Sequence, residues 1–251
     1  MKKISVVILA IAMLFAFVGC FPQDVVLDEM QGFEVSSKVE SMYVEINAAD
    51  FSILLGTEFS VQSNLKYLDV YVKDGVLCIV DEAFGNANYA NAQLVVTIPA
   101  TKVLKHLHIE TGAGKLTGEY LVADNVELDM GAGAVHIESL FANKTCEIDG
   151  GAGEITIDLA FLHNLSVDIG AGQLNLTAQL FGNSELDFGV GEANLTLLGN
   201  KEDYTVKIDK GIGSINVEGQ NVANSSTIGN GENIVDIDGG VGAINLNFQQ
   251  S

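Results

Sequence analysis

The chain of 251 residues is long enough to bury a large core, either as one long domain or as one domain with a small extension. Its 33 acidic residues outnumber its 12 basic residues, all of them lysine, and the formal net charge is −21. This balance argues against nucleic-acid binding, because an acidic surface repels polyanions and a chain without arginine lacks the bidentate group that binds phosphate.

The N-terminal stretch MKKISVVILAIAMLFAFVGC combines a basic start, an apolar run from Ile4 to Val18 and a final Gly19-Cys20. Its length and flanks are typical of a secretory signal rather than a membrane span. The Gly-Cys ending resembles the bacterial lipoprotein signal, in which the cysteine becomes the diacylated N-terminus. That resemblance implies a signal peptide over residues 1–19 and lipidation of Cys20, with an uncleaved N-terminal anchor as the alternative. Residues 20–36 are then expected to be a tether between lipid and domain.

Residues 37–105 predict an N-terminal β region. In MYVEINAADFSILLG (42–56), Ile46 and Ile53 keep the seven-residue step of the later repeats, which predicts a degenerate first coil. The stretch LDVYVKDGVLCIVD (68–81) predicts a β-hairpin whose two-residue turn is Asp74-Gly75. Cys78 and Cys146 lie in apolar strand patterns that are typical of buried free thiols, and a disulfide between them stays open.

Residues 106–251 contain a repeat: a Gly-x-Gly triplet with apolar strand patterns on both sides recurs seven times, at intervals of 19, 20, 19, 19, 22 and 29 residues. The glycines expected at turns between strands are Gly112, Gly114, Gly131, Gly133, Gly151, Gly153, Gly170, Gly172, Gly189, Gly191, Gly211, Gly213, Gly240 and Gly242. Apolar residues alternate at period two on both sides of each triplet, for example Ile148 before and Ile155 and Ile157 after, which indicates strands with one buried face.

A unit of about 19 residues cannot bury its apolar face alone, and stacked copies would give every strand a neighbour about 4.8 Å away. The sequence therefore predicts an all-β fold, a parallel β-solenoid or β-helix of ~19–20-residue coils. Right-handed winding is expected, because parallel crossover connections are almost always right-handed.

Two columns of outward side chains follow from the stacking. Carboxylates two residues before the triplets suggest a cation site, and the alternative is that each accepts hydrogen bonds from glycine N–H groups. The candidate cation column is Asp129, Asp149, Asp168 and Asp187. Amides three residues after the triplets suggest a glycan face, and stacked amide hydrogen bonding is the simpler interpretation. This candidate ligand face is Asn175, Asn194, Asn216 and Asn245.

The order YVEINAADFSI, VYVKDGVLCIVD and LVVTIPA, followed by the repeated strand–GxG–strand unit, resembles the bacterial "putative adhesin" family of unknown function, which is related to the head GIN-domain family. The resemblance covers roughly residues 37–248, although this chain mostly has Gly-Ala-Gly where the family often has Gly-Ser-Gly. It implies a secreted or surface β-solenoid, and it carries no catalytic residues.

Other chemistry finds little support in the sequence. No triplet extends to GxGxxG, no nucleophile motif occurs, and outward carboxylates occur in every repeat, so none is singled out as an acid/base pair. We expect no catalytic residue, no cofactor and no metal site; His108 and His136 are expected to be isolated surface histidines. The 29-residue interval contains residues 219–233, which are predicted to form a ligand loop or a flap over the last coil. That coil ends at Phe248 and offers an open strand for self-association.

The sequence thus predicts a non-enzymatic, lipid-anchored protein on the extracytoplasmic face of the bacterial envelope, serving as an adhesin or in envelope structure or stress signalling. Its partners would be the membrane, through the lipid, and an envelope protein or glycan. The alternative is a module that binds an extracellular glycan or cation through the outward columns, and a polysaccharide-processing enzyme is a third class.

Overall fold

The computed structural model describes residues 24–25, 27–35, 38–83 and 87–250, so Cys20 and the predicted signal peptide lie outside the described residues. Among the residues that the structure describes, fifteen strands and one 3-10 turn, η1 (Lys201–Asp203), make up the secondary structure, which confirms the all-β prediction. No helix of this described part is long and apolar enough to span a bilayer.

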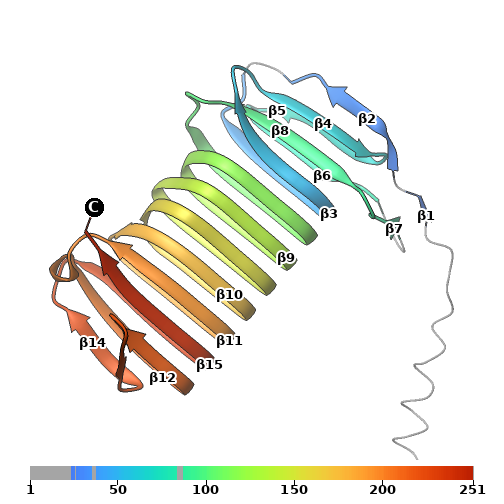
Figure 1. The fold of residues 1–251 in the computed structure, drawn as a ribbon. Coiled ribbons are helices and arrows are strands. Elements are labelled where there is room, and N and C mark those ends of the chain that lie inside the picture. Colours follow the sequence, from blue (N-terminus) through green and yellow to red (C-terminus); the bar gives the residue numbers. More distant parts are fainter. Residues whose placement is uncertain (1–23, 26, 36–37, 84–86, 251) are drawn as a thin grey trace, which may run out of the picture.

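Thirteen strands form one sheet and the other two, β1 and β7, form a short parallel pair (Figure 1). The strands are β1 (Asp24–Val25), β2 (Leu27–Phe33), β3 (Ser41–Gly56), β4 (Ser60–Leu65), β5 (Leu68–Lys73), β6 (Val76–Asp81), β7 (Ala87–Asn88), β8 (Gln93–Pro99), β9 (Leu104–His163), β10 (Leu165–Phe181), β11 (Asn183–Leu198), β12 (Tyr204–Val217), β13 (Gln220–Val222), β14 (Ser225–Gly229) and β15 (Asn233–Gln249).

The centre of the molecule is a parallel stack of long, bent strands, which appear as a row of curved ribbons in Figure 1. Neighbouring strands pair in register at equivalent repeat positions, so Asp168 of β10 lies beside Asp149 of β9 on one side and Asp187 of β11 on the other. The predicted repeat therefore stacks as a β-solenoid-like structure. The right-handed winding stays a prediction.

The stack does not follow chain order at its C-terminal end. β15 pairs parallel with β11 on one side and with β12 on the other, so the last coil of the chain lies between two earlier ones. The expectation of an open coil ending at Phe248 is therefore wrong, because both edges of β15 are already paired. β15 therefore offers no free edge with which a second copy of the chain could pair.

Residues 219–233 carry the chain back to the start of β15. β13 and β14 run antiparallel along the outer edge of β12, after a tight turn in which Glu218 and Gly219 both have positive φ. Ile228 of β14 is 8% exposed and lies opposite Val206. The segment covers an edge strand, as a flap would, but that strand is β12 rather than the C-terminal one.

The Gly-x-Gly triplets are bends inside continuous strands and not separate turns, since the strands run unbroken through them. The second glycine of every triplet has a positive φ, +145° at Gly153. A side chain at Gly153 would meet the carbonyl oxygen of Gly133 in the coil below. Glycine is needed here both for the backbone conformation and for the close approach of stacked backbones.

The core consists of apolar columns inside the stack. The residues three before each first glycine are all buried: Ile109, Leu128, Ile148, Val167, Leu186, Ile208 and Ile237. The residues two after each second glycine are buried as well: Leu116, Val135, Ile155, Leu174, Ala193, Ile215 and Ile244. The period-two alternation therefore predicted the buried face correctly.

At the N-terminal end, β3 adds a coil to the stack, as its rhythm predicted, but the register differs by two residues. Val44 pairs with Ile109 and Phe51 with Leu116, so these two residues, and not Ile46 and Ile53, occupy the repeat positions. All four are buried, which is why the seven-residue step alone could not choose between them.

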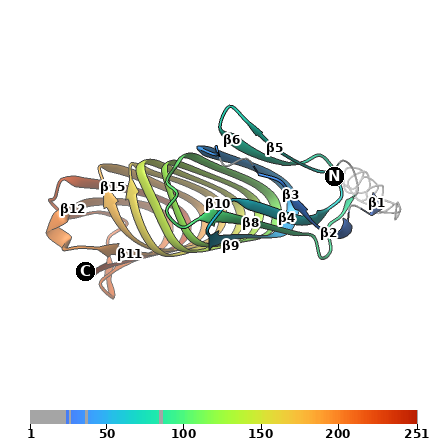
Figure 2. The same ribbon diagram turned by 90° about the horizontal axis from the view of Figure 1, so that it is seen from above.

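The N-terminal end also carries antiparallel additions. The hairpin of β5 and β6 is confirmed, with positive φ at Asp74 and Gly75, and it stands out from the stack in Figure 2. Residues 20–36 are not only a tether, because β2 within them pairs antiparallel with β4. Leu27 and Phe33 pack against the core, and this apolar contact holds the segment to the domain. Cys78 and Cys146 are both free thiols.

Candidate functional site

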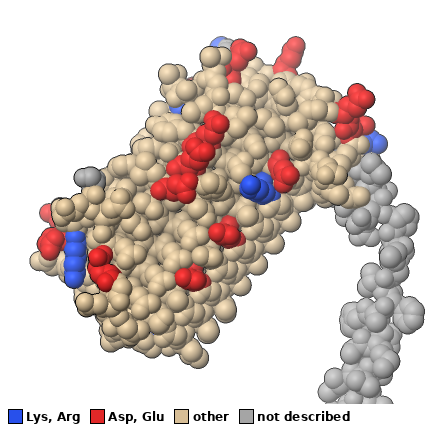
Figure 3. Space-filling view, in the orientation of Figure 1, with Lys and Arg blue, Asp and Glu red and all other residues tan. Residues whose placement is uncertain are grey.

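The outward carboxylates form an in-register ladder across the stacked coils. In the order of the stack they are Glu45, Glu110, Asp129, Asp149, Asp168, Asp187, Asp238 and Asp209. Figure 3 shows acidic side chains gathered in a row across the coils on one face of the molecule. The ladder brings together the four predicted aspartates and continues through the coil that the sequence had placed last.

Two open grooves lie along this carboxylate ladder, between the acidic side chains and the glycine bends. One, of about 470 Å³, is lined by Glu110, Asp129, Asp149 and Asp168 and by the glycines beside them. The other, of about 540 Å³, continues from Asp168 to Asp209 and includes Lys210. The glycine floor leaves backbone within reach of anything that binds to the carboxylates.

Partial burial and mutual repulsion both raise pKa values in the ladder. Partial burial, followed by the charges of Asp238 and Asp168, raises the pKa of Asp187 above its usual range. Partial burial and the charge of Glu127 likewise raise the pKa of Asp129. Each shift means that the charged form is disfavoured in the folded protein, so that a bound cation would relieve the ladder.

The carboxylates do not accept hydrogen bonds from the glycine N–H groups. Within residues 87–250, Asp129 contacts His108, and no bond joins Asp149, Asp168 or Asp187 to a triplet. The interpretation that the acids stabilise the bends is therefore wrong. The triplet backbones instead continue the parallel pairing, for example Gly172 with Gly153.

The predicted amide column is a hydrogen-bonded ladder on the other side of the bends. The Nδ2 of Asn194 donates to Asn175, that of Asn245 to Asn194, and that of Asn216 to Asn245, over 2.8–3.0 Å. All four side chains are half-buried. Because these amides bond mainly to one another, the geometry favours a structural role over a glycan-binding one.

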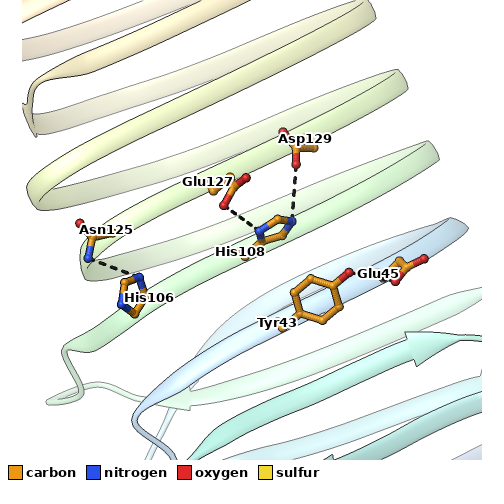
Figure 4. A network of polar contacts seen from close by, with 7 residues as sticks. All are labelled: Tyr43, Glu45, His106, His108, Asn125, Glu127 and Asp129. Atoms are coloured by element: carbon orange, nitrogen blue, oxygen red, sulfur yellow. Dashed lines mark hydrogen bonds and ion pairs between the residues drawn. The ribbon is translucent and has the colours of Figure 1, made fainter.

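A polar cluster lies beside the first regular coils, and Figure 4 shows it from close by. The Nδ1 of His108 is 2.8 Å from Oε2 of Glu127, and its Nε2 is 3.5 Å from Oδ2 of Asp129. The ring of Tyr43 packs against the imidazole, with centroids 4.9 Å apart, and donates its hydroxyl to Glu45. Burial and this hydrogen bond raise the pKa of Tyr43 to about 12.

Sequence reasoning missed Glu127. The signal was present, because Glu127 follows His108 by 19 residues, the period of the repeat, and so occupies the same column one coil further on. Two other outward histidines have different surroundings. His136 pairs with Asp158 alone, at 2.8 Å in an exposed position, and His106 contacts the amide of Asn125.

Comparison with known proteins gives a family and a set of similar folds. A family model described as Toastrack DUF4097 matches residues 56–231. None of the curated proteins matches the chain.

Three solved structures illustrate the similarity. A "putative cell adhesion protein" from Clostridium sporogenes shares 16% identity over 88% of this chain and 99% of its own, with a TM-score of 0.41. A "putative adhesin" from Bacteroides fragilis shares 13% identity over 89% of this chain and 99% of its own, with a TM-score of 0.45. A "putative lipid binding protein" from Parabacteroides distasonis shares 16% identity over 87% of this chain and 96% of its own, with a TM-score of 0.40.

Proposed function

Because the chain belongs to the Toastrack DUF4097 family, we propose that it is a non-enzymatic bacterial surface protein that presents its carboxylate ladder for adhesion or for contacts within the envelope. The observation that carries the proposal is the in-register ladder above two open grooves. A rigid row of equal charges at the spacing of the coils suits a partner with repeated positive groups, bound along its length.

Attachment to the membrane through lipid at Cys20 is part of this proposal. The basic start, the apolar run and the Gly-Cys ending of the N-terminal sequence support it. Two acyl chains give stable anchoring, since each buried methylene contributes roughly 0.8 kcal/mol. We expect Cys20→Ser to move the full chain from the membrane fraction to the soluble fraction, and retention of the variant in the membrane would instead support an uncleaved anchor.

Binding of the full chain to intact cells, peptidoglycan and envelope extracts tests the surface function. Neutralising Asp149, Asp168, Asp187 and Asp238 to asparagine should abolish binding. The matched control removes the same charge from exposed sites outside the ladder: Glu58, Glu138, Glu202 and Glu232, each changed to glutamine. Equal loss in both variants would mean that net charge, and not the ladder, mediates binding.

A cation-binding module is the second candidate, and the raised pKa values of Asp129 and Asp187 favour it. Oxygen-only ligands suit Ca²⁺. If the ladder binds Ca²⁺, the melting temperature should be higher in millimolar Ca²⁺ than in chelator. An unchanged melting temperature would reject this candidate while leaving adhesion open. The glycan alternative predicts loss of glycan binding in an Asn194→Ala, Asn216→Ala double variant.

A further inference from the structure

His108 lies between two carboxylates of the next coil, Glu127 and Asp129. These three side chains are partly buried, and one ligand atom from each lies within 4.8 Å of the others (Figure 4). The three residues come from consecutive coils of one continuous strand, β9, so the stacking of the solenoid fixes their relative positions.

The two nitrogens of the imidazole have different surroundings. Nδ1 is 2.8 Å from Oε2 of Glu127, and because an ionised carboxylate only accepts hydrogen bonds, Nδ1 carries the hydrogen and donates a hydrogen bond to it. The lone pair of the neutral ring is then on Nε2. In the described part of the chain Nε2 is shielded from solvent and has no hydrogen-bond partner.

Oδ2 of Asp129 lies 3.5 Å from Nε2. That distance is longer than a hydrogen bond, and a lone pair facing a carboxylate oxygen is repulsive. A tetrahedral zinc ion bound at about 2.0–2.1 Å by both atoms would hold them roughly 3.3–3.4 Å apart. The observed separation is close to that value without any rearrangement of the coils.

We propose that Nε2 of His108 and the carboxylate of Asp129 bind a divalent transition-metal ion such as Zn²⁺, with Glu127 as the positioning residue that orients the imidazole. A metal-binding histidine commonly donates its other N–H to a carboxylate, which is the arrangement of Glu127 and His108. The imidazole ligand selects Zn²⁺ and its neighbours in the transition series over Ca²⁺ and Mg²⁺. Asp129 also lines the groove, which leaves the remaining positions of the ion to water.

The competing arrangement is an imidazolium that forms ion pairs with both carboxylates and binds no metal. The two arrangements differ in what they predict for added Zn²⁺. This site shares Asp129 with the carboxylate ladder, but it differs from a Ca²⁺ site because it requires a nitrogen ligand, and its test does not depend on adhesion.

The test is Zn²⁺ affinity of the full-length chain purified in detergent, measured by competition with a chromogenic chelator, together with the visible absorption spectrum of added Co²⁺. We expect one site per chain. His108→Gln and Asp129→Asn should each lower the affinity at least tenfold and remove the Co²⁺ band. Glu127→Gln should weaken binding about 10- to 100-fold while keeping a shifted Co²⁺ band, as the loss of a positioning residue does.

His136→Gln is the matched control, because His136 has a single carboxylate partner in an exposed position and should leave the affinity unchanged. Circular dichroism of every variant checks folding, and the glutamine and asparagine replacements are close in size to the native side chains. Equal affinity of the wild type and His108→Gln would overturn the proposal in favour of the imidazolium. Loss of affinity in His136→Gln, or retention in Asp129→Asn, would overturn the ligand assignment.

Discussion

At the scale of single residues, the glycine bends are the positions where an added side chain should destabilise the fold most. Gly153 combines a φ of +145° with a Cβ position blocked by the Gly133 carbonyl oxygen. Gly153→Ala should lower the free energy of unfolding by roughly 2–4 kcal/mol, because the strand must strain or the coils must separate. Chemical denaturation monitored by circular dichroism measures the change.

Two controls separate the causes of that loss. Gly219 has a positive φ but open space around its Cβ position, so Gly219→Ala should cost only about 1 kcal/mol. Gly32 has neither constraint, and Gly32→Ala should leave stability nearly unchanged. If all three variants lose equal stability, close stacking at the bends is not what requires glycine.

Partial burial of Asp187, together with repulsion from Asp238 and Asp168, predicts a pH-dependent gain in stability when this carboxylate is neutralised. Its pKa is raised in the folded state, so its charged form destabilises the fold, and stability from this group is lost as the pH rises through the folded pKa. Asp187→Asn should therefore raise the melting temperature at pH 7 by about 1–2 °C, a small effect because water screens the ladder.

The gain should shrink as the pH falls and vanish below the unfolded value of about 3.9, where the native carboxyl is already protonated. Asp69→Asn, an exposed change outside the ladder, should have no comparable effect. A melting temperature that falls at pH 7 in Asp187→Asn would show that the carboxylate stabilises its neighbours instead.

At the scale of elements, the amide ladder should hold adjacent coils together. Asn245 donates to Asn194 and Glu192 and accepts from Asn216. Asn245→Ala leaves half-buried partners without bonds and should cost about 1–2 kcal/mol. Asn247→Ala, two residues further along the same strand and exposed, should be nearly neutral. Equal thermal stability of the two variants would mean that the ladder contributes nothing.

The elements also show what the sequence could and could not predict. Period-two alternation and the seven triplets were sufficient to locate the buried columns and the places where the chain changes direction, and the Asp74-Gly75 dipeptide was sufficient for the hairpin, since these depend on local chemistry. The register of β3 was missed by two residues, because Ile46 and Val44 are both buried and equally apolar. In the candidate site, the sequence predicted the columns of aspartates and asparagines. It would have predicted Glu127 beside His108 only if the 19-residue period had been counted forward from His108.

At the scale of the whole molecule, the order of stacking could not be derived from the repeat. β12 and β15 carry equivalent triplets with similar flanks, so the sequence does not say which of them pairs with β11. In the structure β13 and β14 occupy one edge of β12 and β15 occupies the other, and β15 pairs with β11. The edge of the stack is thereby closed by short strands of opposite direction. Such an edge discourages pairing with further chains.

This order makes a prediction about hydrogen exchange that differs from the usual behaviour of chain ends. C-terminal segments commonly fray, but β15 is bonded on both sides, as β10 is, whereas β14 pairs only with β12. Amides of β15 should exchange about as slowly as those of β10 and much more slowly than those of β14, in exchange followed by mass spectrometry. Exchange in β15 as fast as in β14 would mean that the coils stack in chain order, with an exposed final strand at Phe248.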